Sequence, residues 1–271
     1  GIIFILLSLT NVREAIFNAI PMNLKSAVSV GIGLFIAFVG LQNAHIVVGG
    51  STLLQLFSVD AYNKANGVEA SFNNVGITVI LALAGIIITG ILVVKNIKGN
   101  ILWGILITWG LGIICQFAGL YVPNADLGFY SLLPDFSKGL SIPSLTPIFG
   151  KLQFKGIFSV DFIVILFAFL FVDLFDTIGT LVGVSAKADM LDEEGKLPHI
   201  KGALLADAVA TTVGAILGTS TTTTFVESAS GVSEGGRTGL TAVTTAILFG
   251  LSLFLSPIFL AIPSFATAPA L

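Results

Sequence analysis

The sequence has few charged residues for its length. Asp, Glu, Lys and Arg make up 10% of the 271 residues, whereas hydrophobic residues make up 55% and the mean hydropathy is +1.02. An average soluble domain carries about 25% charged residues, and this chain has too little polar surface to cover a fold of this length in water. The composition therefore excludes an ordinary soluble domain and indicates a membrane protein whose solvent is lipid.

Cysteine and concentrated positive charge are also scarce. Cys115 is the only cysteine, which excludes an intrachain disulfide and a cysteine metal cluster. The net charge is −3, and the chain lacks the basic stripe that nucleic-acid binding requires. The glycine-rich stretch 231–239 lacks the Gly-Lys-Ser/Thr of a phosphate loop, so nucleotide hydrolysis is unsupported. We expect no enzyme activity, no metal, no cofactor and no nucleic-acid partner.

Long apolar runs dominate what is present. A helix needs about 20 apolar residues to cross the hydrocarbon core. The chain begins and ends within such runs, which suggests a fragment of a longer membrane protein. Windows of this length predict the end of a helix at 1–10 and spans at 27–49, 76–94, 101–120, 159–186, 202–218, 238–255 and from 257 onward.

Lysine and arginine predict the orientation of these spans. Eight of the 12 fall in the short segments 11–26, 95–100 and 187–201 and at Arg237, and four fall in two longer loops, 50–75 and 121–158. Cytoplasmic loops carry the excess of Lys and Arg, so 95–100 and 187–201 are expected in the cytoplasm and 121–158 outside. Segment 11–26 mixes charged and apolar residues, which favours an interfacial stretch parallel to the membrane.

Two carboxylates lie midway along the predicted span 159–186. Asp173 and Asp176 are three residues apart and share one helix face, with Thr180 one further turn along. Ionisable residues inside a bilayer are costly, so each is a candidate for function. The alternative is that both carboxylates only bind neighbouring helices and hold the bundle together.

A second polar run follows the predicted span 202–218. Residues 219–224 are all Ser or Thr, mostly β-branched, which favours extended backbone over helix. Thr224 and Glu227 have the spacing of a capping box, so a half-helix is expected to begin there. Such broken helices build transporter sites; the alternative is that Glu227 only caps its own helix. Asp207, near the start of span 202–218, is placed to brace this broken segment.

Several of these segments resemble the nucleobase:cation symporter family, and most closely its AzgA-like branch of adenine, guanine and hypoxanthine permeases. The likeness covers nearly the whole chain apart from loops. The segments that carry it are 31–38, 171–184, 197–207, 218–239 and 266–271.

The resemblance implies an all-α polytopic membrane protein. Its fold would have fourteen segments in two inverted repeats, divided into a core and a gate domain, with a short half-strand in the broken segment near 219–226. The chain would then be a fragment that runs from the fourth segment into the twelfth. The implied parts are the end of the fourth segment and an interfacial stretch (1–26), gate spans five to seven (27–120), an extracytoplasmic loop (121–158), core spans eight to eleven (159–255) and the start of the twelfth span in the gate (256–271).

The resemblance also implies a site. Asp176 on the eighth segment and Glu227 at the start of the tenth correspond to the residues that bind the base, with backbone groups at Val226 and Ser228 adding hydrogen bonds. Several relatives carry His or Asp where this chain has Thr180. Which group carries the coupled proton therefore stays open, and the candidates for proton coupling or support of the site are Asp173, Thr180, Asp207 and Thr224.

The expected function is proton-coupled uptake of purine bases (hypoxanthine, guanine and adenine) across the plasma membrane, by a protein that relatives suggest is a homodimer. Purine N–H groups are donors that a carboxylate accepts well. The closest alternative is a uracil or xanthine carrier of the same fold, and an anion carrier is disfavoured by the acidic residues. A remote alternative is an intramembrane aspartyl protease, but that chemistry pairs aspartates from two helices, whereas Asp173 and Asp176 lie on one.

Overall fold

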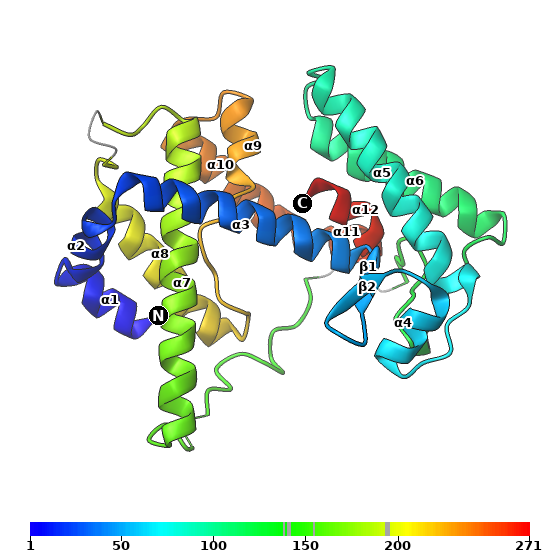
Figure 1. Ribbon diagram of the computed structural model, residues 1–271, viewed down its shortest axis with the longest axis horizontal. Coiled ribbons are helices and arrows are strands. Elements are labelled where there is room, and N and C mark those ends of the chain that lie inside the picture. The colour runs from blue at the N-terminus through cyan, green and yellow to red at the C-terminus, as the bar shows by residue number, and fades with distance from the viewer. Residues whose placement is uncertain (138, 140–141, 154, 193–195) are drawn as a thin grey trace. The chain divides into compact units, whose positions relative to one another are not determined.

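A computed structural model describes the whole chain except residues 138, 140–141, 154 and 193–195 (Figure 1). The expected loops 121–158 and 187–201 include these positions, which lie outside the described residues. The described chain divides into two compact units. Unit 1 comprises Gly1–Leu34 and Ser144–Val243, and unit 2 comprises Phe35–Pro143 and Thr244–Leu271.

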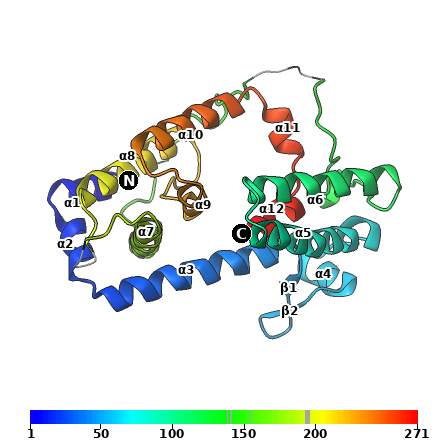
Figure 2. The same cartoon turned by 90° about the horizontal axis from the view of Figure 1, so that it is seen from above.

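Unit 1 is built from helices only, in the part that the structure describes. It contains α1 (Ile2–Leu9), α2 (Val12–Ala19), the first part of α3 (Met22–Asn43), α7 (Val160–Lys187), α8 (Ile200–Leu217), α9 (Ser228–Ser233) and the first part of α10 (Gly239–Ser252). The short helix α9 packs against α7, as Figure 2 shows, and α1 packs against α8.

Unit 2 adds a small sheet to its helices. It contains the remainder of α3 and α10, strands β1 (Val47–Gly49) and β2 (Leu54–Leu56), α4 (Val59–Asn66), a π-helical turn (Phe72–Gly76), α5 (Ile77–Val94), α6 (Asn100–Phe117), α11 (Ser256–Ala261), α12 (Ser264–Thr267), and 3₁₀ turns at Ala125–Leu127 and Ala268–Ala270. The two strands pair antiparallel, with Val48 opposite Gln55. The core of this unit gathers around Val75, Ala82, Leu132 and Phe265.

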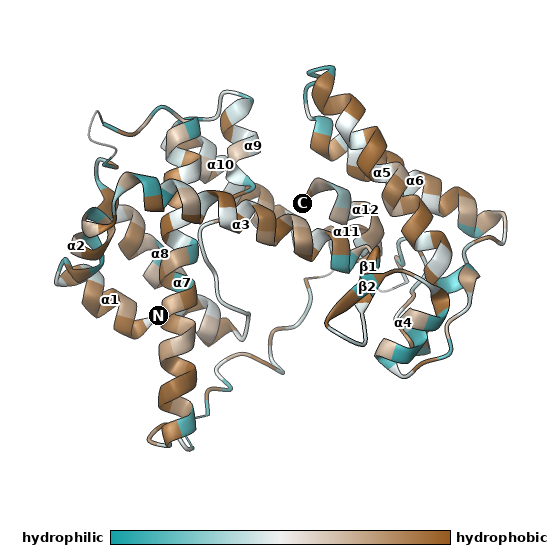
Figure 3. Cartoon of the chain, in the orientation of Figure 1, coloured by the Kyte–Doolittle hydropathy of each residue, from teal (hydrophilic) through white to brown (hydrophobic). Residues whose placement is uncertain are grey.

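Among the described residues, five helices are long and apolar enough to cross a membrane. They are Met22–Asn43, Phe72–Val94, Asn100–Phe117, Val160–Lys187 and Ile200–Leu217. Large apolar side chains on them are exposed, among them Ile87 (63%), Ile114 (63%) and Phe169 (66%), and Figure 3 shows mostly hydrophobic residues along α5, α6 and α7. Lipid rather than water satisfies such faces, so the prediction of an all-α polytopic membrane protein is confirmed.

The beginning of the chain differs from the prediction. Helices α1 and α2 meet at a bend of 77°, where Asn11 takes the left-handed conformation (φ 60°). Within the predicted interfacial stretch 11–26, Arg13 is 0% exposed and packs inside unit 1. The span predicted at 27–49 begins instead at Met22, directly after Pro21, and ends at Asn43 because the chain turns at His45 (φ 58°) into the β-hairpin.

The end of the chain is not one continuous span from residue 257. Helix α11 ends at Ala261 and α12 begins at Ser264. Ile262 is extended (ψ 116°) because it precedes Pro263, and a residue before proline is driven out of the helical region. The predicted span 238–255 is shorter in the structure, as the 14 residues of α10.

Close helix packing fixes the part of α7 that carries the two aspartates. A Cβ atom at Gly179 would collide with the side chain of Ile32 on α3, so the absence of a side chain here favours the close approach of the two helices. Another face of α7 packs Ile178, Leu181 and Val182 against Phe17 of α2 and Leu204 of α8. This part of α7 is thus packed against α2, α3 and α8.

Candidate functional site

Asp173 and Asp176 line one cavity of about 330 Å³ in unit 1. Because the two residues are three positions apart on α7, they point to the same side of that helix. Threonines from α8 and from the segment that follows it complete the polar lining: Thr211, Thr221 and Thr223. The other lining residues are Gly1 and the apolar Phe4, Leu166, Phe169, Leu170 and Val172. A volume of this size lies at the lower end of the range for small-molecule pockets.

Asp173 has no hydrogen-bond partner for either carboxylate oxygen within the described part of the chain, although it is only 9% exposed. Buried polar side chains are almost always hydrogen-bonded, so an unpaired one calls for an explanation. Asp173 is a lining residue of the cavity, but its two oxygens are themselves buried, so in this structure the carboxylate is both unpaired and shielded.

Asp176 is half-buried and accepts a hydrogen bond from Thr223. This contact links α7 to the non-helical stretch between α8 and α9, residues 218–227, which we call the broken segment. Thr177 and Thr180 are buried (0% and 1% exposed) and do not line the cavity. Thr180, one turn beyond Asp176, therefore serves the packing of α7 in this structure.

Asp207 of α8 connects four parts of unit 1. Its Oδ2 atom accepts from Nη2 of Arg13 at 3.2 Å and from the hydroxyl of Thr177 at 3.3 Å. Its Oδ1 atom accepts from the backbone N–H of Thr224 at 3.2 Å and from the Thr224 hydroxyl at 3.3 Å. Asp207 thereby ties α2, α7 and the broken segment to α8, and we refer to Arg13, Thr177, Asp207 and Thr224 as the Asp207 cluster.

The broken segment leaves helix α8 at Gly218 (φ 82°) and resumes helical structure at Ser228. The expected half-strand near 219–226 is not a paired strand in the described chain. Its backbone groups bind α8 side chains instead of a strand ladder: the Thr222 carbonyl accepts from the Thr211 hydroxyl at 2.8 Å, and Thr224 donates to Asp207. The expected capping box is also absent, because the Thr224 hydroxyl binds Asp207 and α9 begins with Glu227 as its N-cap residue.

Glu227 does not share the cavity with Asp176. Its side chain and that of Ser228 are exposed, Val226 is half-buried, and none of the three lines the cavity. Glu227 is nevertheless close enough to Asp176 for the two charges to interact. The structure thus brings Asp173 and Asp176 together with three threonines, places the Asp207 cluster beside them and leaves Glu227 outside.

Sequence reasoning missed Arg13 and the threonine lining. Arg13 lies in a segment whose mixture of charged and apolar residues predicts an interfacial stretch, yet an ionisable residue in so apolar a chain is itself a signal of function. Thr211 gave no local signal, since a threonine in a helix is usually only a packing residue. Among the described residues no group of three or more His, Cys, Asp or Glu is placed to hold a metal ion.

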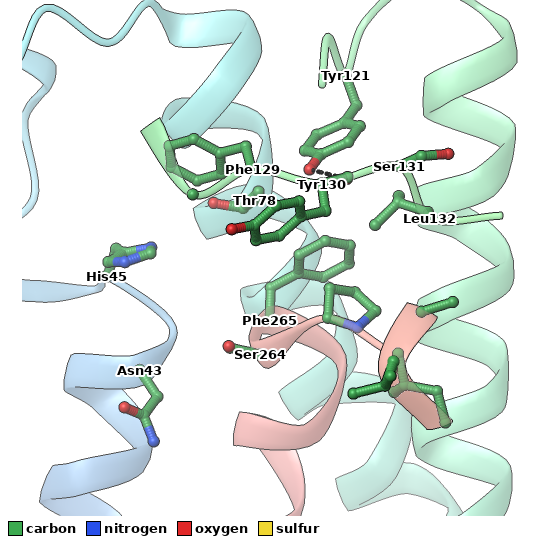
Figure 4. A pocket seen from close by; sticks show the side chains of 15 residues that line it. Asn43, His45, Thr78, Tyr121, Phe129, Tyr130, Ser131, Leu132, Ser264 and Phe265 are labelled. Atoms are coloured by element: carbon green, nitrogen blue, oxygen red, sulfur yellow. Dashed lines mark hydrogen bonds between the residues drawn. The ribbon is translucent and has the colours of Figure 1, made fainter. Parts of the chain in front are cut away.

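Unit 2 has a cavity of its own, of about 280 Å³ (Figure 4). His45 contacts Tyr62 and Phe129 edge to face, at 5.0 and 6.1 Å between ring centroids. Burial lowers the pKa of His45, and it raises the pKa of Tyr121, whose hydroxyl donates to the Tyr130 carbonyl at 2.8 Å, to about 12. The residues that line this cavity include no carboxylate, so the cavity of unit 1 is the better candidate for a site that handles protons.

Comparison with known proteins gives one consistent family. A family model described as Permease family matches residues 1–271. The chain is 43% identical to the guanine/hypoxanthine permease PbuG of Bacillus subtilis over 273 residues, 42% identical to the guanine/hypoxanthine permease PbuO of the same organism over 274 residues, and 35% identical to the adenine permease AdeP of Escherichia coli over 268 residues. These alignments cover 100%, 100% and 98% of the chain. They cover 56%, 57% and 54% of the relatives, so the chain spans about half of their length.

Proposed function

The chain belongs to the nucleobase–ascorbate and xanthine–uracil permease family, and from this premise we propose that it forms the substrate-binding part of a transporter that takes up purine bases together with protons. The observation that carries the proposal is the cavity in which Asp173 and Asp176 face three threonine hydroxyls between apolar walls.

The lining of this cavity suits a purine. Ring N–H groups are donors, and a carboxylate such as that of Asp176 accepts them strongly where water is excluded. Threonine hydroxyls both donate and accept, so Thr211, Thr221 and Thr223 can match the ring nitrogens and the exocyclic oxygen or amine. Phe4 and Phe169 offer apolar contact for the rest of the planar ring.

The two aspartates are proposed to have different roles, one in binding the base and one in carrying the proton. Asp176, held by Thr223, accepts from the base. Asp173 has no partner within the described chain and is the natural carrier of the coupled proton, since a carboxylate that is removed from water takes up a proton readily. Glu227, with the backbone at Val226 and Ser228, would bind the base as it enters or leaves; the charge interaction between Glu227 and Asp176 supports this role.

The two units suggest how transport proceeds. Unit 1 carries the cavity and would be the core domain, and unit 2 would be the gate domain of a homodimeric protein in the plasma membrane. Movement between the two domains would expose the loaded site to either side in turn. Loops 95–100 and 187–201 would lie in the cytoplasm, as the excess of Lys and Arg predicts.

Uptake of labelled hypoxanthine tests the proposal. The full-length protein is produced in cells that lack purine uptake of their own, and the initial rate is measured at several external pH values. We expect saturable uptake that increases as the external pH falls and is blocked by a protonophore. Uptake no greater than that of cells without the transporter would contradict the proposal.

A uracil or xanthine carrier is the second candidate, because the family is also named for xanthine–uracil permeases. Competition by a panel of unlabelled bases separates the two candidates. Inhibition by hypoxanthine, guanine or adenine supports the purine assignment, and inhibition by uracil or xanthine alone supports the alternative. Because the chain belongs to a permease family, the alternative of an intramembrane aspartyl protease has no support.

A further inference from the structure

We propose that Arg13 is a positioning residue for the binding cavity, through its ion pair with Asp207. The inference rests on the proposed function of the cavity and assigns a role to a residue that does not itself line it. Arg13 acts at a distance by fixing the two chain segments that bear Asp176 and Thr223.

The contacts of Arg13 leave it little freedom. Its side chain is fully buried, with Nη2 3.2 Å from Asp207 Oδ2 and Nη1 donating to the Leu204 carbonyl at 3.0 Å. Its guanidinium lies over the ring of Phe4, 4.1 Å from the centroid. Arginine is always charged in proteins and can form several directed hydrogen bonds at once. Arg13 therefore holds α2 against two successive turns of α8, at Leu204 and Asp207.

The ion pair determines where Asp207 can point. The Asp207 carboxylate accepts four hydrogen bonds, which is about what an ionised carboxylate can take. Two come from Thr224 and one from Thr177. Each of these threonines neighbours a cavity residue in the sequence: Thr177 follows Asp176, and Thr224 follows Thr223.

The geometry of the cavity thus depends on this buried charge pair. Asp176 and Thr223 are joined by their own hydrogen bond, and the residues next to them are joined through Asp207. With Arg13 removed, the buried Asp207 carboxylate would lose its counterion, and an unpaired buried charge is strongly disfavoured. Asp207 would then reorient or take up a proton, and α7 and the broken segment would lose their common anchor.

A second ion pair in the same unit provides a matched control. Arg237 donates to Asp189 at 2.9 Å, but the two side chains are 47% and 80% exposed. Exposed pairs of this kind contribute little to stability. The change Arg237→Met removes an arginine from an Arg–Asp pair without touching the Asp207 cluster.

The experiment compares the concentration dependence of hypoxanthine uptake by the full-length wild type, Arg13→Met, Arg13→Lys, the double variant Arg13→Met/Asp207→Asn, and Arg237→Met. Replacing both members of a buried pair usually preserves folding, whereas removing one does not. The double variant therefore tests positioning separately from the cost of an unpaired charge. Protein amount in the membrane and size-exclusion profile in detergent are recorded for every variant.

We expect the double variant to fold but to show a KM raised about tenfold, a loss typical of a directed contact between coupled residues. Arg13→Lys keeps the charge but loses the fork of directed donors, so its KM should lie between that of the wild type and that of the double variant. Arg237→Met should match the wild type. A double variant with wild-type KM would overturn the inference, since the pair would then serve folding alone, and so would Arg13→Met that folds with unchanged KM. Absence of uptake by the wild type would instead refute the proposed function.

Discussion

Asp173 and Asp176 face the same cavity from adjacent turns of α7, yet only Asp176 has a hydrogen-bond partner, Thr223, in the described part of the chain. Two carboxylates of the same helix thus have different surroundings. This difference is the basis for assigning them different tasks, and it can be tested residue by residue.

The change Asp176→Asn should weaken binding of the base. The amide keeps the size of the side chain but loses the charge that strengthens hydrogen bonds from ring N–H groups, so we expect the KM for hypoxanthine to rise about 10- to 100-fold. Concentration-dependent uptake by the full-length protein measures this. A KM within twofold of the wild type, at normal protein level, would remove Asp176 from the binding site.

The change Asp173→Asn should separate binding from coupling. An amide cannot carry the proton, so accumulation of the base against its gradient should be lost while exchange of labelled for unlabelled base continues. Counterflow in proteoliposomes and uptake with an imposed pH gradient measure the two activities side by side. Retained accumulation in this variant would show that another group carries the proton.

The change Thr223→Val should reproduce part of the Asp176 effect, because valine keeps the shape of threonine but cannot donate to the carboxylate. We expect a rise in KM of about fivefold, the value of one ordinary hydrogen bond. Thr267→Val is the matched control, since Thr267 is exposed and its hydroxyl donates to the carbonyl of Ser264, in unit 2. Equal KM values for the two variants would argue against the role of Thr223.

The change Gly179→Ala should lower the stability of unit 1, because the added Cβ meets Ile32 on α3. Overpacking of this kind costs about 1–3 kcal/mol. Thermal unfolding in detergent measures the loss, and the second change Ile32→Ala should recover part of it by making room. Gly231→Ala, where nothing lies within 4 Å of the added atom, is the control. A lack of recovery by Ile32→Ala would mean that α3 and α7 do not pack as described.

His45 should affect the stability of the protein at low pH. Burial lowers the pKa of His45 below its ordinary value of 6.5, so the unfolded chain binds a proton that the folded chain does not. The stabilisation is therefore present above pH 6.5 and is lost as the pH falls below it. The variant His45→Gln should show a shallower decline in melting temperature between pH 7 and pH 5. An unchanged decline would mean that His45 does not titrate in this range.

The sequence determined the class of protein and the location of its chemistry. The scarcity of charge required lipid as the solvent, and apolar runs of about 20 residues placed the long spans, since both features depend on composition and length alone. The pair Asp173 and Asp176 and the non-helical run after Gly218 were visible because i, i+3 spacing and β-branched residues act locally.

Only the tertiary structure decided which side chains meet. Arg13 and Asp207 are 194 positions apart, and nothing local indicates that a bend of 77° between α1 and α2 brings the arginine to α8. Thr211 likewise gave no local sign that it lines the cavity. Glu227 was expected at the site from the resemblance, but it does not line the cavity. Local pattern fixes which face of an element is polar, but the partner of a buried charge is set by packing between helices distant in the chain.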